Sequence, residues 1–272
     1  MIRFISSFLI TLWILIIPSI AFGTSPDTLI IRGKVSDYGG NPIPNCSVAF
    51  NNSRFESNYE TVTDSLGKYY LEVPRGRYMS IGACRLDEYQ HTASASLPDS
   101  LKRLEWWGWN ICAEKDSIID IRYNRMEAYG ISVFTIPGAS PAFQIFVRPM
   151  SLTRYQKWAI GQENIQHGMD LSNVRGKALL ENANATLLAP PPDLLNVKVF
   201  IDGEEVPVLL KQEIKEYQDA MTYGNAYLLT VGLPKWENGL TTDTIRFRIE
   251  LEDLENGDKG EAIYDYTFPA YK

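Results

Sequence analysis

Hydrophobic and polar residues alternate along most of the chain in short runs that end at glycine, proline, asparagine or aspartate. Residues 29–35 are apolar and β-branched, and the cluster Gly39-Gly40-Asn41-Pro42 then ends the run. Tyr69, Leu71 and Val73 recur with a period of two, which places them on one face of an extended strand. Such alternation between turn residues predicts β-strands. In the first half we expect strands at residues 29–35, 47–50, 60–63, 68–73, 78–83 and 117–123.

A second series of strand patterns follows Arg125. The turn Asn256-Gly257 suits a tight hairpin, because both residues tolerate positive φ. A helical spacing of Leu152, Tyr155 and Ala159 behind Ser151 predicts a short helix within residues 151–180, with Ser151 as its N-cap. Residues 211–221 fit either a helix face or a strand. The strands expected here are residues 131–136, 142–147, 197–201, 226–231, 244–251 and 262–268.

These patterns predict an all-β protein of two antiparallel β-sandwich domains, residues 24–125 and 126–272. The second sandwich could be immunoglobulin-like with a short helical insertion, although the Cys-Trp-Cys signature of true immunoglobulin domains is absent.

The N-terminus has the features of a leader for export. Arg3 precedes an apolar run over residues 8–17, and the small-residue site Ala21-Phe22-Gly23 follows. This order predicts a signal peptide, residues 1–23, although the apolar run could instead be retained as a membrane anchor. We therefore expect an exported protein of the periplasm, cell surface or extracellular space. Short triplets resembling the O-glycosylation motif of exported Bacteroidetes proteins agree with export; they begin at Asp27, Asp64, Asp99, Asp116 and Asp243.

Four turn motifs follow one another between Ile31 and Tyr78. They are Arg32-Gly33-Lys34-Val35-Ser36-Asp37, Gly40-Asn41-Pro42-Ile43-Pro44, Thr63-Asp64-Ser65-Leu66-Gly67 and Val73-Pro74-Arg75-Gly76-Arg77-Tyr78. Their order resembles the carboxypeptidase regulatory-like domain, a transthyretin-like β-sandwich. The resemblance covers residues 29–123 and does not extend to the C-terminal half. It implies a scaffold of exported proteins without catalytic residues of its own.

Charge and motif content argue against several classes of function. The net charge is −7 and no stretch concentrates Lys and Arg, so a nucleic acid partner is not expected. His91 and His167 are the only histidines, which disfavours a zinc site. Neither a Gly-x-Ser-x-Gly elbow nor a phosphate-binding glycine loop occurs. We expect no enzyme activity, no catalytic residues, no metal and no cofactor; a hydrolase with a carboxylate pair in the second domain is the less favoured alternative.

Two further groups of residues leave alternatives open. Export could oxidise one pair among Cys46, Cys84 and Cys112, or all three could be buried thiols. An acidic cluster near the Asn256-Gly257 turn could bind calcium, but a solvated hairpin end explains it equally well. That cluster comprises Asp253, Glu255, Asp258 and Glu261.

The best candidates for ligand binding are Trp106, Trp107 and Trp109, with Tyr89 upstream. In an extended segment Trp107 and Trp109 share one face and Trp106 takes the other. Packing between the two domains is the simpler role for these rings, and a platform for sugar rings is the alternative. We therefore expect a protein-interaction or structural module, with a protein partner or a cell-surface glycan, or alternatively a glycan-binding module.

Overall fold

The computed structural model describes residues 27–89, 97–139, 141–159, 184–217, 222–236 and 243–269. Within these ranges almost all regular structure is β-strand, with the α-helix α1 (Leu152–Ala159) and a short 3-10 turn, η2 (Asp99–Leu101). The all-β prediction is confirmed. The predicted signal peptide and both histidines lie outside the described residues.

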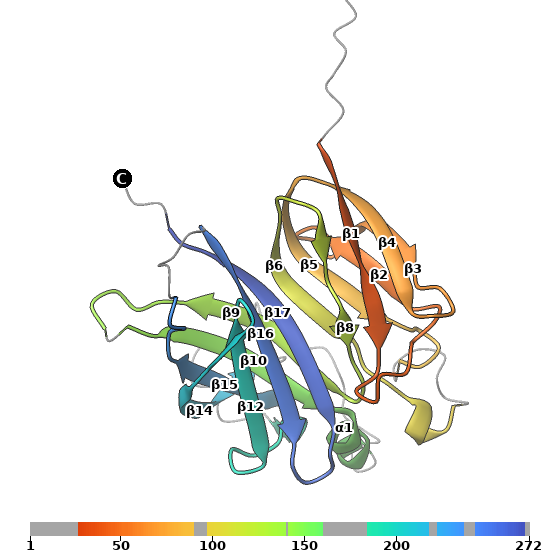
Figure 1. Cartoon of the computed structure of the whole chain (residues 1–272). Helices are drawn as coiled ribbons and strands as arrows, with labels where there is room; N and C mark the ends of the chain where they lie inside the picture. Colours follow the sequence, from red (N-terminus) through yellow and green to blue (C-terminus); the bar gives the residue numbers. More distant parts are fainter. Residues whose placement is uncertain are drawn as a thin grey trace, which may run out of the picture.

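The strands form three sheets that enclose two hydrophobic cores (Figure 1). In chain order they are β1 (Thr28–Ser36), β2 (Ser47–Asn51), β3 (Ser57–Val62), β4 (Lys68–Pro74), β5 (Gly76–Cys84), β6 (Trp106–Ala113), β7 (Ser117–Ile118), β8 (Ile121–Arg122), β9 (Met126–Phe134), β10 (Phe143–Ser151), β11 (Asn184–Thr186), β12 (Leu195–Ile201), β13 (Glu204–Val206), β14 (Val208–Tyr217), β15 (Thr222–Val231), β16 (Thr244–Asp253) and β17 (Lys259–Thr267).

The largest sheet has eight strands in the order β13-β12-β16-β17-β6-β5-β2-β3. One small sheet, β4-β1 with β7 and β8, packs against its β6-β5-β2-β3 half and encloses the N-terminal core. The other small sheet, β11-β15-β10-β9 with β14, packs against its β13-β12-β16-β17 half and encloses the C-terminal core. Each half of the eight-stranded sheet therefore has one face under a small sheet.

The two cores meet where β6 pairs in parallel with β17. Ala262 and Ile263 of β17 lie opposite Trp107 and Gly108 of β6. Because successive strand residues point to opposite faces, Ala262 enters the C-terminal core and Ile263 enters the N-terminal core. The two cores thus share one continuous sheet, and each takes in a residue from the other side of residue 125, Trp109 in the C-terminal core and Ile263 in the N-terminal core.

The sheets are mixed rather than purely antiparallel, which corrects one part of the prediction. Parallel pairs join β6 to β17, β11 to β15, and β1 to both β7 and β8. The strand expected at residues 117–123 is divided into β7 and β8, which pair with successive stretches of β1. Residue alternation predicts an extended segment but carries no information on the direction of its partner.

The turn at Asp64 and the predicted cap of the short helix are confirmed by hydrogen bonds. The Asp64 carboxylate accepts from the backbone N–H groups of Leu66 and Lys68, each at 2.8 Å, and Gly67 has a φ of +72°. Ser151 Oγ accepts from the Arg154 N–H at 3.1 Å, which makes Ser151 the cap of α1. The ambiguous segment after residue 211 belongs to strand β14 as far as Tyr217.

Most of the acidic cluster near the β16–β17 turn is buried rather than solvated. Asp253 is fully buried and pairs with Arg154, while Asp258 is 4% exposed and accepts from Arg125 Nε at 3.2 Å. Asp258 also accepts from Ser151 Oγ at 2.6 Å, so the hairpin is fastened to the start of α1. The expectation of exposure is wrong for Asp253, Asp258 and Glu261, which are buried in ion pairs, whereas Glu255 is exposed. In the hairpin itself, Gly257 has a φ of +79° and Asn256 does not adopt positive φ.

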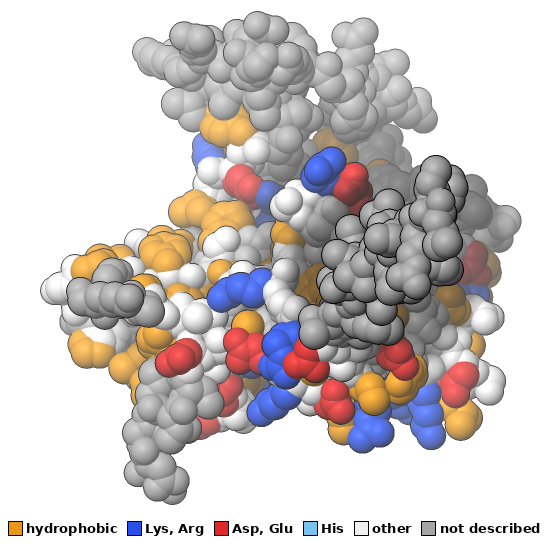
Figure 2. All heavy atoms as spheres, turned by 90° about the horizontal axis from the view of Figure 1, so that it is seen from above, with side chains coloured by type: hydrophobic (Ala, Val, Ile, Leu, Met, Phe, Trp, Pro, Cys, Tyr) orange, Lys and Arg blue, Asp and Glu red, His pale blue; other side chains and the backbone are white. Residues whose placement is uncertain are grey.

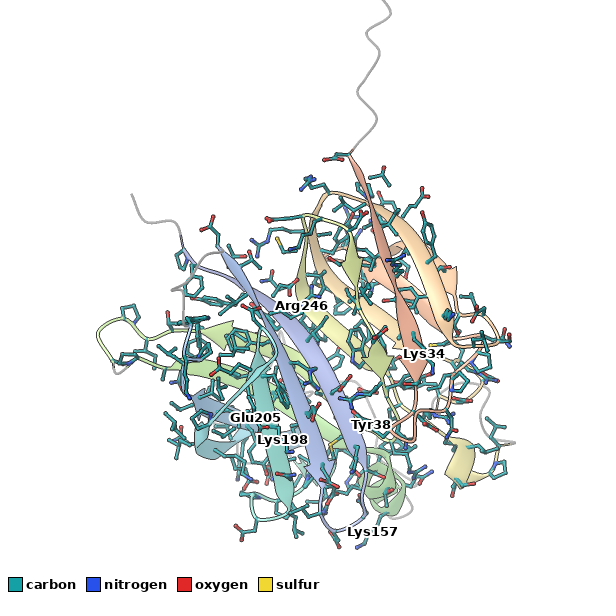
Figure 3. All side chains as sticks on the ribbon, in the orientation of Figure 1. Lys34, Tyr38, Lys157, Lys198, Glu205 and Arg246 are labelled. Carbon is teal, nitrogen blue, oxygen red and sulfur yellow. The ribbon has the colours of Figure 1, made fainter. Side chains whose placement is uncertain are left out.

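A second group of ion pairs joins the N-terminal sheet to the uncovered face of β16 and β17. Arg122 of β8 donates to Glu250 Oε1 at 2.6 Å and to Glu261 Oε2 at 2.5 Å. The Arg122 guanidinium also lies 5.3 Å from the ring centroid of Tyr38. Within the eight-stranded sheet, Arg246 of β16 pairs with Asp265 of β17; Figure 3 labels Tyr38 and Arg246. The Arg122 contacts join the N-terminal sheet to β16 and β17 on the face opposite Trp107.

Cys46, Cys84 and Cys112 are all free thiols, Cys46 being fully buried. Figure 2 shows acidic and basic side chains intermingled on the face seen from above. Among the described residues, α1 and the other helical segments are too short to span a bilayer.

Candidate functional site

The structure separates the four predicted site residues into three environments. Trp106 is 1% exposed and belongs to the N-terminal core, so it does not face a cleft. Trp109 is 8% exposed and packs at the edge of the C-terminal core. Trp107 is partly buried and lines a cavity together with Tyr89. The expected placement of Trp107 and Trp109 on one face and Trp106 on the other is confirmed.

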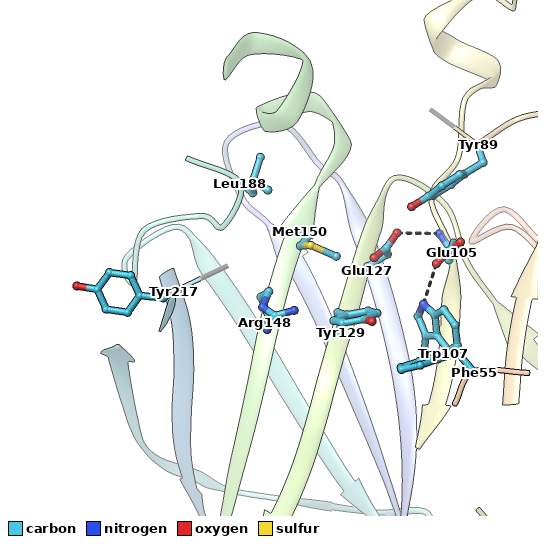
Figure 4. Close-up of a pocket in the computed structure, with 10 residues that line it drawn as sticks. All are labelled: Phe55, Tyr89, Glu105, Trp107, Glu127, Tyr129, Arg148, Met150, Leu188 and Tyr217. Carbon is cyan, nitrogen blue, oxygen red and sulfur yellow. Dashed lines mark hydrogen bonds between the residues drawn. The ribbon is translucent and has the colours of Figure 1, made fainter. Parts of the chain in front are cut away.

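The cavity lies where the edge strand β9 of the C-terminal sheet approaches β6 (Figure 4). On this side the β6-β5-β2 part of the large sheet is not covered by the N-terminal sheet. The cavity has a volume of about 480 Å³, which falls in the range of small-molecule sites. Its lining residues are Phe55, Tyr89, Glu105, Trp107, Glu127, Tyr129, Arg148, Met150, Leu188 and Tyr217.

A second cavity of about 190 Å³ continues from the first over β2 and β5. Phe55, Glu105 and Trp107 line both cavities. We call the combined space the Trp107 cleft. Gly82 forms part of its floor and lies directly opposite Trp107 in the β5–β6 pair. The absence of a side chain there leaves room for the indole, because a Cβ at Gly82 would come within 3.3 Å of that ring.

Aromatic rings hold Trp107 in place. Its ring stacks on Trp109 with the centroids 5.2 Å apart and an interplanar angle of 23°. Phe55 and Tyr129 each meet Trp107 edge to face, at 6.1 Å and 5.9 Å. Phe55 is 51% exposed and has a left-handed φ of 61°, so the β2–β3 turn holds a large apolar ring at the rim of the cleft. The platform is rigid because each ring packs against another.

Two carboxyl groups lie side by side next to this platform. Glu105 directly precedes β6 and accepts from Trp107 Nε1 at 3.0 Å. Glu127, the second residue of β9, is 3% exposed and accepts from the Glu105 backbone N–H at 3.2 Å. Burial and the nearby Glu105 charge raise the pKa of Glu127 to about 8, and burial also raises the pKa of Glu105. Figure 4 places both groups on the same wall.

The basic group of the cleft already has an acidic partner. Arg148 of β10 donates through Nε and Nη2 to the two carboxylate oxygens of Glu216 on β14. Its guanidinium lies 5.2 Å from the ring centroid of Tyr129. Arg148 therefore supplies an ordered planar group at one end of the cleft, while its charge is largely balanced by Glu216.

Sequence reasoning found Trp107 and Tyr89 but missed Phe55, Glu105, Glu127, Tyr129 and Arg148. The nearest available signal was the position of Glu105 beside the tryptophans. No local pattern marks Glu127, because only the packing of β9 beside β6 brings it to Glu105.

No protein-family model matches the chain, and none of the curated proteins matches it. Among solved structures, one similar chain is a Bacteroides uniformis ATCC 8492 protein to which carbohydrate binding has been provisionally ascribed. It has 10% identity and a TM-score of 0.27, over 90% of this chain and 100% of that one. Two others are major pilin subunits. BcpA of Bacillus cereus has 10% identity and a TM-score of 0.25, over 89% of this chain and 69% of that one. SpaD of Corynebacterium diphtheriae has 8% identity and a TM-score of 0.21, over 88% and 64%. No function is transferred at this degree of similarity.

Proposed function

We propose that the protein is an exported, non-enzymatic interaction module that binds a glycan in the Trp107 cleft. The observation that carries the proposal is the position of Trp107, partly exposed on a rigid aromatic platform and shared by two contiguous cavities. The C–H face of a sugar ring packs on a flat aromatic surface, and its hydroxyl groups need polar partners at the edge. Glu105, Tyr129 and Arg148 supply such partners.

The shape of the cleft favours an oligosaccharide over a single sugar. The larger cavity continues into the smaller one past Trp107 and Phe55, so neighbouring sugar units can occupy both. Its open form also agrees with an extended ligand that continues into solvent.

The arrangement of carboxyl groups supports binding rather than cleavage. Glycoside hydrolysis in most families uses two carboxyl groups that flank the scissile bond. Glu105 and Glu127 instead lie next to one another, joined by the hydrogen bond from the Glu105 backbone to Glu127. This geometry supports a module that holds its ligand without transforming it.

The test is a titration of the full chain with soluble oligosaccharides, followed by tryptophan fluorescence and calorimetry. We expect quenching with at least one glycan and, for Trp107→Ala, affinity about 10-fold or more weaker, because the stacking surface is lost. Trp107→Phe retains a ring and should bind at an intermediate level. Trp236→Phe, whose ring lies at a different cavity, serves as the control. If no glycan binds, or if Trp107→Ala binds as the parent does, the proposal fails.

A further inference from the structure

The polar half of the Trp107 cleft is acidic, and its two carboxyl groups form no ion pair with a described basic residue. Glu105 and Glu127 both line the cavity, and within the described part of the chain neither carboxylate is paired with Lys or Arg. Arg148, the one basic residue among the lining residues, is hydrogen-bonded to Glu216, and its charge lowers the pKa of Glu127 only in part against the effects of burial and Glu105. A buried carboxyl pair without a cation is costly, so an arriving positive charge is favoured there.

The buried carboxyl of Glu127 has an oxygen left over for a ligand. Its Oε1 accepts from the Glu105 N–H, whereas its Oε2 has no hydrogen-bond partner among the residues that the structure describes. Glu105 likewise uses Oε2 for the Trp107 indole and leaves Oε1 without a partner in the described ranges. Two acceptor oxygens thus remain at one end of a cavity whose other walls are aromatic.

Aromatic rings beside this pair complete a site for a cation. Trp107, Tyr129 and Tyr89 line the same cavity as the two carboxyl groups. The negative face of an aromatic ring attracts ammonium groups, most strongly for tryptophan, and flanking carboxylates add to that attraction. A neutral sugar would stack on the aromatic rings but would offer only hydroxyl groups to the two acceptor oxygens of Glu105 and Glu127.

Resting on the proposed glycan function, we infer that the Trp107 cleft selects glycans that carry a free amino group, with the ammonium held between Glu105 and Glu127. The sugar ring lies on Trp107 and its ammonium donates to Glu127 Oε2 and Glu105 Oε1. The Glu127 carboxyl, when protonated in the empty cleft, releases its proton to solvent as the ammonium binds, so no other reactant is needed.

The groups that face the carboxyl pair are compatible with this exchange. Tyr89 and Tyr129 remain neutral, because burial raises the pKa of each phenol. Cys84 lines the adjoining cavity and also remains protonated, since burial and Glu105 raise the pKa of its thiol. Arg148, held by Glu216, is the remaining charged group among the lining residues described. Glu105 and Glu127 are therefore the groups that titrate when a cation arrives.

The experiment compares two oligosaccharides with the same backbone, glucosamine oligomers and their fully N-acetylated counterparts, by calorimetry at pH 5.5, where the amino groups of the former are protonated. We expect the amino form to bind about 10-fold more tightly. Repeating the amino titration in buffers of different ionisation enthalpy should reveal proton release. Glu127→Gln and Glu105→Gln should each reduce the preference towards one while binding of the N-acetylated form persists. Glu205→Gln, an exposed residue of β13 with the same change in charge, should leave the preference unchanged.

The outcomes separate this inference from the proposed function. Equal or tighter binding of the N-acetylated oligomer overturns the inference and leaves glycan binding intact. A preference that survives in both glutamine variants also overturns it, because the ammonium must then bind elsewhere. Binding of neither oligomer, together with no response to other glycans, overturns both. Circular dichroism of each variant establishes that the fold is retained.

Discussion

Replacing Ile263 by alanine should destabilise both halves of the protein at once. Ile263 belongs to β17, near the C-terminus, yet its side chain is 6% exposed in the N-terminal core. It packs over Gly108 of β6, where a Cβ would come within 2.8 Å of Ile263 Cγ1. The variant therefore opens a cavity at the joint of the shared sheet.

The expected loss follows from the atoms removed. Ile263→Ala deletes three buried carbon atoms, which at about 0.8 kcal/mol each amounts to about 2.5 kcal/mol of transfer free energy. The residual cavity brings the expected decrease in unfolding free energy to about 3–4 kcal/mol. Gly108 offers no side chain that could move into the space, so little relaxation is expected.

The assay is urea unfolding followed by far-UV circular dichroism, with alkylation of Cys46 as a local probe of the N-terminal core, in which that thiol is fully buried. Ile245→Ala, in the C-terminal core, is the matched control. If the shared sheet couples the cores, both variants shift a single transition and expose Cys46 at lower urea. Two separate transitions, with Cys46 responding to Ile263→Ala and not to Ile245→Ala, would refute the coupling.

Three further predictions concern other parts of the structure. Asp258→Ala removes the acceptor of the hydrogen bonds from Ser151 and Arg125, so the unfolding free energy should fall by about 3–5 kcal/mol. Urea denaturation measures this loss. Asp258→Asn should lower the unfolding free energy by less. The pKa of Glu127 is raised to about 8 on folding, so the melting temperature should fall as pH rises from about 5 towards 9. Glu127→Gln should have a melting temperature that depends less on pH over that range. If the plots of melting temperature against pH are parallel for the parent and the variant, the prediction is wrong. Gly33→Ala would place a Cβ 2.0 Å from the Ile119 carbonyl oxygen and should cost about 1–3 kcal/mol by thermal melting, whereas Gly76→Ala, with open space around it, should be nearly neutral.

The alternation of apolar and polar residues was sufficient to predict most strands from the sequence, because the two faces of those strands differ in polarity. It failed for β6, where both faces are apolar since each meets a different core. The alternation of inward and outward residues also shifts by one position at Asn110, which has a left-handed φ of 51°. Trp109 before this point faces the C-terminal core, and Ile111 after it faces the N-terminal core. A search for a period of two therefore finds no continuous strand there.

The candidate site was only half predictable for a related reason. Trp107 is conspicuous by residue type, so composition alone directed attention to it. Glu127 looks like an ordinary polar residue of an alternating strand, and its burial results from the way β9 lies beside β6. A carboxyl group buried by tertiary packing has no signature in its sequence neighbours.

The parallel pair β6–β17 also sets the order in which the chain can finish folding. Strand β6 is made early, but its neighbour β17 begins at Lys259, after all the other strands that the structure describes. Until β17 has left the ribosome, β6 is an open sheet edge and the N-terminal core lacks Ile263. The N-terminal core thus remains incomplete until β17 has been synthesised. If the protein is exported as proposed, the N-terminal core is therefore completed only after β17 has also crossed the membrane.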